Sequence, residues 1–276
     1  MPELPEVETI KRILEPQLVG RTITRLTLNR PDIVERPAPE VFAAAVTGAK
    51  ITGMERRGKY LSILLDSCAR IILHLRMTGC LLVTPPDYPE EKHTHLVFHL
   101  DDGNELRFID PRRFGRFWLF QSDEEDTVSG VHKLGPEPFD KMLTATYLSD
   151  ALSKRKRAIK DCLLDQSLVA GIGNIYADET LFTAKVRPDR AACTLTDDEW
   201  KRLAATIPGV IMRALEANAM TPEEYLAGKG QEYRSTPSFQ VYGHVSEPCP
   251  RCGEILRRSV VAGRGSVYCP ACQREP

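Results

Sequence analysis

The spacing of apolar residues divides the 276-residue chain into a strand-rich first part and a helical second part. From Val7 to Leu18 apolar residues recur at helical intervals, and Gly20 ends this segment, so we expect a leading helix. Residues 21–120 then hold short apolar runs separated by turn signals. Several short strands of this kind indicate a β-sandwich or a barrel, and we predict a sandwich as the N-terminal domain, residues 1–130.

The second part of the chain carries helical patterns and follows a linker that we place at residues 131–150. Alanine, lysine and leucine lie in helical order over 151–164, and the turn Gly171-Ile-Gly-Asn174 precedes a second helix over 175–184. We therefore predict a helical domain over residues 151–238 and an α+β fold for the whole chain.

Composition is that of an ordinary globular protein, with 42% hydrophobic and 27% charged residues. No apolar run reaches the roughly 18 residues that a membrane-spanning helix needs. The opening Met1–Glu6 is acidic and broken by prolines, whereas a secretory signal has a basic region followed by an apolar one. We expect a soluble protein of the cytoplasm without contact to a membrane.

The net charge of −1 by itself argues against nucleic acid as the partner, but the charges are segregated. Five cations lie between Lys154 and Lys160, and the tail from Cys249 carries five arginines, while Asp123–Asp126 is an acidic run. A single basic run is more often a solvated face than a binding surface. Two runs on separate elements favour a surface that binds phosphates, because only local charge is needed there.

Four cysteines near the C-terminus have the spacing of a metal site. Cys249-x₂-Cys252 and Cys269-x₂-Cys272 are separated by 16 residues, as in zinc sites with four cysteine ligands. Four thiolates leave zinc no open position for water, so one structural Zn²⁺ is predicted, in a hairpin over residues 239–276. The alternative, a pair of disulfides or unconnected thiols, is disfavoured without a secretory signal.

The other four cysteines lack such partners, and we expect buried, unreactive side chains at Cys68, Cys80, Cys162 and Cys193. The tip of the predicted hairpin contains Gly263-Arg264-Gly265. Two glycines let the backbone approach a phosphate closely while the guanidinium of the arginine binds it.

Several segments, in matching order from the second residue to the end, resemble one family. They are Pro2–Glu8, Arg57–Leu61, His74–Met77, Asp110–Gly115, Gly171–Tyr176 and the four-cysteine tail. Together they resemble bacterial formamidopyrimidine-DNA glycosylases, also called 8-oxoguanine DNA glycosylases. The sister family, endonuclease VIII, typically has glycine where Leu4 stands here, so the purine-directed branch is favoured.

The resemblance implies that Pro2 is the catalytic nucleophile. Removal of the initiator methionine leaves a secondary amine, and a terminal amine titrates near pH 8, so roughly a tenth of it is neutral at pH 7. Attack on the sugar C1′ gives a cationic iminium, which labilises the neighbouring sugar protons. The plainer reading is that Pro2 only begins a helix. The resemblance further gives catalytic roles to Glu3 in proton transfer, to Lys59 in phosphate contact and β-elimination, and to Arg264 in phosphate binding and δ-elimination.

The resemblance also implies residues that hold DNA with a nucleotide turned out of the duplex. Met77, Arg112 and Phe114 match a wedge that fills the vacated space, although Met77 and Phe114 would otherwise be read as core residues. The turn at Gly171–Asn174 matches a helix-two-turn-helix motif. Further DNA contacts are implied for His74, His93, Lys156, Lys160 and Asn174. A polar loop at 228–238 lies where the family closes over the extruded base.

The predicted activity is therefore base-excision repair by a bifunctional glycosylase and lyase. Its partner is double-stranded DNA with oxidised bases or abasic sites, and we expect a nucleoid-associated monomer with one zinc ion. Two alternatives stay open: an endonuclease VIII-like enzyme that prefers oxidised pyrimidines, and a non-catalytic zinc protein that only binds DNA. Intact Pro2, Glu3 and Lys59 argue against the second alternative.

Overall fold

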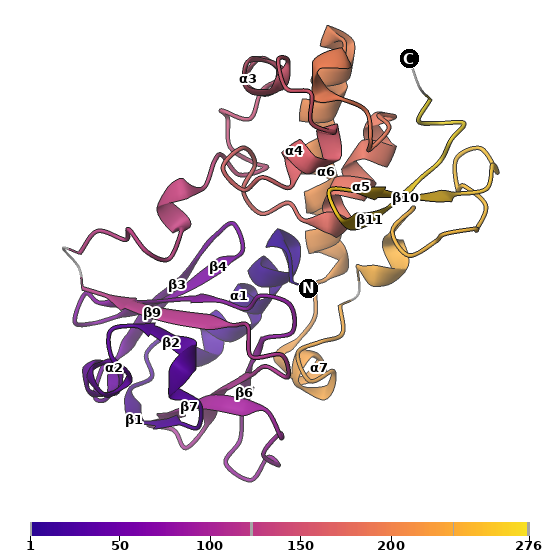
Figure 1. Ribbon diagram of the computed structural model, residues 1–276. Helices are drawn as coiled ribbons and strands as arrows, with labels where there is room; N and C mark the ends of the chain where they lie inside the picture. The colour runs from indigo at the N-terminus through magenta and orange to yellow at the C-terminus, as the bar shows by residue number, and fades with distance from the viewer. Residues whose placement is uncertain (1, 122–123, 234, 275–276) are drawn as a thin grey trace. The chain divides into compact units, whose positions relative to one another are not determined.

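The computed structural model describes residues 2–121, 124–233 and 235–274 (Figure 1). Met1, Asp123 of the acidic run and Arg234 of the loop at 228–238 lie outside them. The chain forms two compact units: an N-terminal unit of Met1–His132 with Asn218–Tyr233, and a C-terminal unit of Lys133–Ala217 with Arg234–Pro276. Asn218–Tyr233, which the sequence analysis assigned to the helical domain, thus groups with the N-terminal unit.

Two sheets form the centre of the N-terminal unit. The first has the order β1-β7-β8-β6, with β1 (Ile23–Leu28), β6 (Cys80–Thr84), β7 (Thr94–Leu100) and β8 (Glu105–Ile109), all antiparallel. The second has the order β2-β9-β5-β4-β3, with β2 (Val34–Arg36), β3 (Ile51–Arg57), β4 (Tyr60–Leu65), β5 (Arg70–His74) and β9 (Arg116–Phe120). In this sheet only the β2–β9 pair is parallel.

The two sheets share one hydrophobic core, which confirms the predicted sandwich. The ring of Phe108 on β8 meets that of Phe117 on β9 edge to face, with centroids 4.9 Å apart. The leading helix α1 (Leu4–Leu18) adds Val7, Ile10 and Leu14 to the same core, as its apolar spacing predicts. α2 (Pro39–Val46) and α7 (Pro222–Ala227) complete the unit.

In the described part of the C-terminal unit, the regular elements are helices and one hairpin. Its helices are α3 (Ala145–Leu152), α4 (Ile159–Leu163), α5 (Asn174–Ala184) and α6 (Asp197–Ala217), and its two strands are β10 (Arg257–Val261) and β11 (Arg264–Tyr268). The hairpin packs on α5, because Phe182 shares a small core with Val241, Leu256 and Val267.

Short 3₁₀ turns occur in both units, at Pro31–Ile33, Val131–Lys133, Ala192–Thr194 and Thr236–Ser238.

The predicted single helix over 151–164 is wrong, because α3 ends at Leu152 and α4 begins at Ile159. The intervening basic segment turns away from helical geometry. Its carbonyls at Arg155 and Arg157 accept hydrogen bonds from the N–H groups of Cys193 and Ala192. A run of cations is also better hydrated in an exposed turn than on a packed helix face. In the part of the chain that the structure describes, no helix is long and apolar enough to cross a membrane.

Candidate active site and metal centre

Pro2 and Glu3 precede α1, and the start of that helix fixes their position. Glu3 is the residue before the first helical turn, and its N–H donates to the Glu6 carboxylate at 2.9 Å. A carboxylate three residues into a helix commonly satisfies an N–H at its start in this way. Pro2 and Glu3 are both buried, with Glu3 fully so. The hydrogen bond at Glu3 and the burial of both residues therefore fix the position of Pro2 at the start of α1.

Pro2 lines a pocket of about 180 Å³. Met77, Thr78 and Gly79 line it from the loop after β5, Pro111 from the loop after β8, and Gly230, Gln231 and Tyr233 from the segment after α7. We call it the Pro2 pocket. All of these residues belong to the N-terminal unit.

Gly230 lets the segment after α7 reach the Pro2 pocket. Its φ is +66°, and a Cβ at this position would lie 2.9 Å from Leu82 and 3.0 Å from the Tyr225 hydroxyl. Only glycine fits both the conformation and the space. Burial raises the pKa of Tyr233, which faces the same pocket, well above its usual value, so its hydroxyl stays protonated at neutral pH.

The three predicted wedge residues lie on exposed loop tips. Met77 is 41% exposed and Phe114 44% exposed, so the alternative reading of these two as core residues is wrong. The guanidinium of Arg112 lies 4.6 Å from the centroid of the Phe114 ring. Arg112 and Phe114 therefore present a stacked cation and ring beside the exposed thioether of a neighbouring loop.

Asp110, to which the sequence analysis gave no role of its own, organises both wedge loops. Its fully buried carboxylate accepts hydrogen bonds from the N–H groups of Phe114 at 2.7 Å, Gly115 at 2.8 Å and Arg112 at 3.1 Å. It also accepts the Thr78 hydroxyl at 2.5 Å, which ties in the loop that carries Met77. The donors are backbone N–H groups of the loop after β8, and neither a helical nor a strand pattern in the sequence predicts such a role.

Lys59, His74 and His93 also lie in the N-terminal unit. Lys59 follows the turn residue Gly58, whose φ is +57°, between β3 and β4. Burial, together with the charges of Arg76 and Lys59, lowers the pKa of His74 to about 3, so this imidazole is neutral at physiological pH. Its Nδ1 accepts the Arg76 N–H at 2.9 Å. His93 is half-buried, and its carbonyl accepts the Asp110 N–H.

Of the DNA contacts predicted in the C-terminal unit, Lys160 is fully buried. Its ammonium lies 2.8 Å from the Asp178 carboxylate and donates to the Gly265 carbonyl and the Ser266 hydroxyl, each at 3.0 Å. Asp178 also accepts the Ser266 hydroxyl at 2.6 Å and the Val267 N–H at 3.1 Å. Lys160 thus holds the start of β11 from within.

Asn174 lies at the first turn of α5 and donates to the same Gly265 carbonyl at 3.2 Å. Arg264 directly precedes this carbonyl in the chain and is exposed, as is Lys156 in the turn between α3 and α4. The C-terminal unit therefore brings Asn174, Lys160 and the hairpin tip together, with an exposed guanidinium beside a helix N-terminus, an arrangement that suits a phosphate.

The four sulfur atoms of Cys249, Cys252, Cys269 and Cys272 all lie within 4.8 Å of one another. The Cys252–Cys269 and Cys249–Cys272 distances are 3.5 and 4.0 Å, far longer than the roughly 2.05 Å of a disulfide. A tetrahedral zinc with bonds of about 2.3 Å places its sulfurs about 3.8 Å apart, so the cluster fits the ion. Backbone N–H groups of Arg251 and Cys272 donate to Cys249 and Cys269, at 3.4 Å each.

The remaining cysteines divide into two pairs. Cys80 and Cys162 are buried, as predicted, and burial raises the pKa of Cys80 to about 12. The prediction is wrong for Cys68 and Cys193, which are exposed. Both occur in tight turns: Cys68 has a φ of +61°, and Cys193 lies in the 3₁₀ turn Ala192–Thr194.

Three family models match the chain and together cover most of it. They are the formamidopyrimidine-DNA glycosylase N-terminal domain over residues 1–117, the H2TH domain of the same family over 134–225, and the zinc finger found in FPG and IleRS over 246–274.

Curated relatives match over nearly the full length. The formamidopyrimidine-DNA glycosylase of Symbiobacterium thermophilum is 46% identical over 276 residues, covering 100% of this chain and 90% of the relative. That of Geobacillus kaustophilus is 44% identical over 275 residues, covering 99% and 100%.

Solved structures of the Lactococcus lactis enzyme Fpg are similar to the whole chain. The complex with DNA containing FAPY-dG has a TM-score of 0.89 at 35% identity, covering 99% of this chain and 100% of the other. The complex with DNA containing an oxidised pyrimidine has a TM-score of 0.90 at 35% identity and the same coverage.

Proposed function

Because the chain belongs to the formamidopyrimidine-DNA glycosylase family, we propose that it excises oxidised purines from duplex DNA and then cuts the strand, with Pro2 as the nucleophile. The observation that carries this proposal is the position of Pro2, which directly precedes the N-cap of α1 and lines a pocket of about 180 Å³. An extruded base in this pocket would bring its sugar C1′ to the Pro2 nitrogen.

The proposed reaction uses one covalent intermediate. The neutral amine of Pro2 attacks C1′, the bond from C1′ to the base breaks, and the base leaves with its electron pair. Opening of the sugar ring then gives an iminium between Pro2 and C1′. Loss of a proton from C2′ expels the 3′ phosphate, and a second elimination releases the 5′ phosphate. Water finally frees the Pro2 nitrogen.

Glu3, Lys59 and Arg264 are the proposed partners of Pro2. Glu3 follows it in the chain and is buried, so its carboxyl can transfer a proton to the sugar ring oxygen or the leaving base. For Lys59 we propose contact with a phosphate and proton transfer in the first elimination. For Arg264, exposed at the hairpin tip, we propose that it binds the phosphate that leaves in the second elimination.

The wedge of Met77, Arg112 and Phe114 is proposed to fill the space that the extruded nucleotide leaves. Met77 and Phe114 would replace lost stacking, which costs a few kcal/mol, while Arg112 would donate to the unpaired partner base. Met77 and Phe114 are exposed, so both side chains are accessible to a duplex. His93, next to Asp110, and neutral His74 are proposed as further DNA contacts.

In the C-terminal unit we propose that Lys156, Asn174 and Arg264 contact DNA phosphates. Lys160 is proposed as a positioning residue, because its ammonium is fully buried and already holds Asp178, Gly265 and Ser266. It would act on DNA through the hairpin tip. Zinc at the four cysteines would keep the hairpin folded, since a segment this small has little core of its own. We further propose a nucleoid-associated monomer in the cytoplasm.

Borohydride trapping tests the proposed function. Reduction of the iminium should join the protein to duplexes that carry 8-oxoguanine, and the joined peptide should begin at Pro2. A matched control carries an acetyl group on the Pro2 nitrogen, which turns the amine into a non-nucleophilic amide and should abolish trapping while the fold is retained. Binding of lesion DNA without any adduct would instead support the non-catalytic alternative.

A second lesion in the same assay addresses the pyrimidine-directed alternative. We retain this alternative because a structure of the similar Lactococcus lactis enzyme was solved with DNA containing an oxidised pyrimidine. Single-turnover excision should be faster on 8-oxoguanine than on an oxidised pyrimidine. The opposite order would assign the chain the endonuclease VIII-like preference.

A further inference from the structure

A second pocket lies in the C-terminal unit, at the opposite end of α5 from Asn174. Its volume is about 480 Å³, and it is lined by Lys185, Arg190, Thr196, Glu199, Arg251, Ala271, Cys272 and Arg274. Lys185 directly follows the last residue of α5, and α5 has 11 residues, so this pocket lies about 16 Å from the helix start. We call it the α5 C-terminal pocket.

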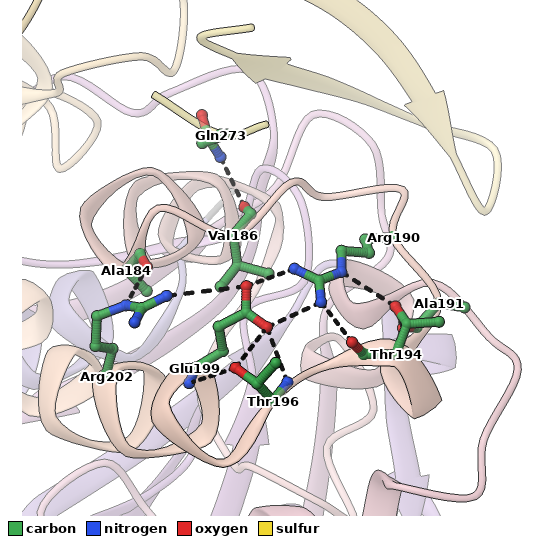
Figure 2. Close-up of polar contacts among 9 residues, drawn as sticks. All are labelled: Ala184, Val186, Arg190, Ala191, Thr194, Thr196, Glu199, Arg202 and Gln273. Carbon is green, nitrogen blue, oxygen red and sulfur yellow. Dashed lines mark hydrogen bonds and ion pairs between the residues drawn. The ribbon is translucent and has the colours of Figure 1, made fainter. Parts of the chain in front are cut away.

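Four cations line this pocket, against one carboxylate among its described lining residues. That carboxylate, Glu199, is already neutralised: Arg190 binds its two oxygens at 2.5 and 2.9 Å, and Arg202 lies 3.8 Å from it (Figure 2). The Thr196 N–H also donates to it at 2.8 Å (Figure 2). Glu199 therefore has little capacity left to balance the other cations.

Part of the positive charge has a structural use. Arg251 donates to the Phe182 carbonyl at 3.3 Å and Arg202 to the Ala184 carbonyl at 3.2 Å, both at the negative end of α5. A zinc ion with four thiolates would carry two net negative charges, and Cys272 lines the pocket. Among the residues that the structure describes around the pocket, five cations with Arg202 included, less Glu199 and these two charges, leave two positive charges.

We assign the two unbalanced positive charges to Lys185 and Arg274, which are both exposed. Lys185 is exposed, and among the residues that the structure describes no side chain or carbonyl pairs with its ammonium. Arg274 is exposed as well and gives one nitrogen to the Ala271 carbonyl at 3.0 Å. Both retain donors for an anion in the pocket.

We propose that the α5 C-terminal pocket binds a phosphate group of a nucleic-acid backbone, as a second DNA-binding site separate from the one around Asn174 and Arg264. An acidic peptide fits less well, because Ala271 is the one aliphatic side chain in the described lining and offers nothing to anchor a peptide's apolar residues. Such a site would hold undamaged DNA and help the enzyme to pass between segments of it.

The test is the salt dependence of binding to a long undamaged duplex. In Lys185→Gln/Arg274→Gln, the slope of log K against log salt should fall in magnitude by about 1 to 2, because each lost phosphate contact contributes about 0.9. Excision of 8-oxoguanine from a short duplex should be unchanged, which separates this outcome from a failure of the proposed function. Lys201→Gln, an exposed lysine on α6 outside the pocket, is the matched control and should leave the slope as it is.

Three results would overturn the proposal. An unchanged slope in the double variant, with faster loss of zinc to a chelator, would show that these cations only balance the thiolates. Titration with inorganic phosphate that shifts the Lys185 resonances, while long DNA does not, would assign the pocket to a small phosphate ligand. Binding of poly-glutamate that depends on both residues, without any effect on DNA, would assign it to acidic peptides.

Discussion

Single residues with several partners set the geometry of the Pro2 pocket and its surroundings. Asp110 joins two loops through one carboxylate, and His74 lies beside Lys59 with its imidazole held neutral. Asp110 acts through burial beside fixed N–H groups, and the pKa of His74 is lowered by burial and by the charges of Arg76 and Lys59. Changes at these residues should therefore have large local effects.

Asp110→Asn should destabilise the N-terminal unit by about 2–4 kcal/mol, because an amide replaces one acceptor oxygen by a donor that faces the Phe114 and Gly115 N–H groups. Urea denaturation measures this loss. Excision should fall as well, since Met77 and Phe114 lose their common support. Asp32→Asn, at an exposed carboxylate paired only with Arg30 in the described structure, is the control and should change stability by less than about 0.5 kcal/mol. Equal effects of the two variants would argue against the role of Asp110.

The His74 imidazole should remain neutral well below pH 6. Its pKa in the folded protein is about 3, against about 6.5 when unfolded, so the unfolded chain binds the extra proton between these values. Stability should therefore fall as pH decreases from about 6.5 towards 3, and His74→Asn should lose this part of the acid sensitivity. NMR titration of the imidazole reports it directly. A midpoint near pH 6.5 in the folded protein would contradict the expectation.

At the scale of elements, the hairpin β10–β11 is fixed to α4 and α5 by a buried ion pair. Lys160 of α4 and Asp178 of α5 both hold the residues just after Arg264. A buried pair of this kind is costly to break from one side, because the remaining charge has no solvent. The orientation of the hairpin tip thus depends on side chains from two helices.

Lys160→Met should cost about 3–5 kcal/mol, because it leaves Asp178 charged and buried. Adding Asp178→Leu should recover much of this stability, as measured by denaturant unfolding. Phosphate binding by Arg264 should stay impaired in the double variant, because Gly265 and Ser266 lose their anchor. DNA binding restored together with stability would contradict a positioning role for Lys160.

At the scale of the whole molecule, each unit has its own hydrophobic core, and only the C-terminal unit contains the four-cysteine cluster. Zinc should therefore stabilise the two units unequally. Removing zinc with a chelator should unfold the hairpin over residues 246–274, since structural zinc contributes folding energy directly. The N-terminal unit should keep its protection in hydrogen exchange, while affinity for DNA falls. Loss of protection in β1–β9 to the same extent would contradict this independence.

Much of the architecture could be predicted from the sequence because it follows from short-range patterns. The leading helix, the sandwich and the zinc cluster each have a period or a spacing that survives in the fold. The break between α3 and α4 could not be predicted in this way, because it depends on hydrogen bonds of the basic segment to residues about 35 positions later in the chain.

For the candidate site, too, the sequence predicted individual residues but not the contacts between distant parts of the chain. The family resemblance predicted Pro2, Glu3 and the wedge residues as members of the site, whereas their positions in space are seen only in the structure. The role of Asp110 and the burial of Lys160 depend on side chains brought together from distant parts of the chain, which one sequence does not reveal. The same holds for the exposed Cys68 and Cys193, whose turn conformations have no local signature.

The four hydrogen bonds that meet on Asp110 also limit how this enzyme can diversify. An insertion or deletion in either wedge loop would displace both loops at once, so natural variation there should be confined to side chains. In the segment after α7, the position that the described residues fix by conformation and space is Gly230. Relatives that acquire new lesion preferences should therefore differ first in the residues that flank this glycine.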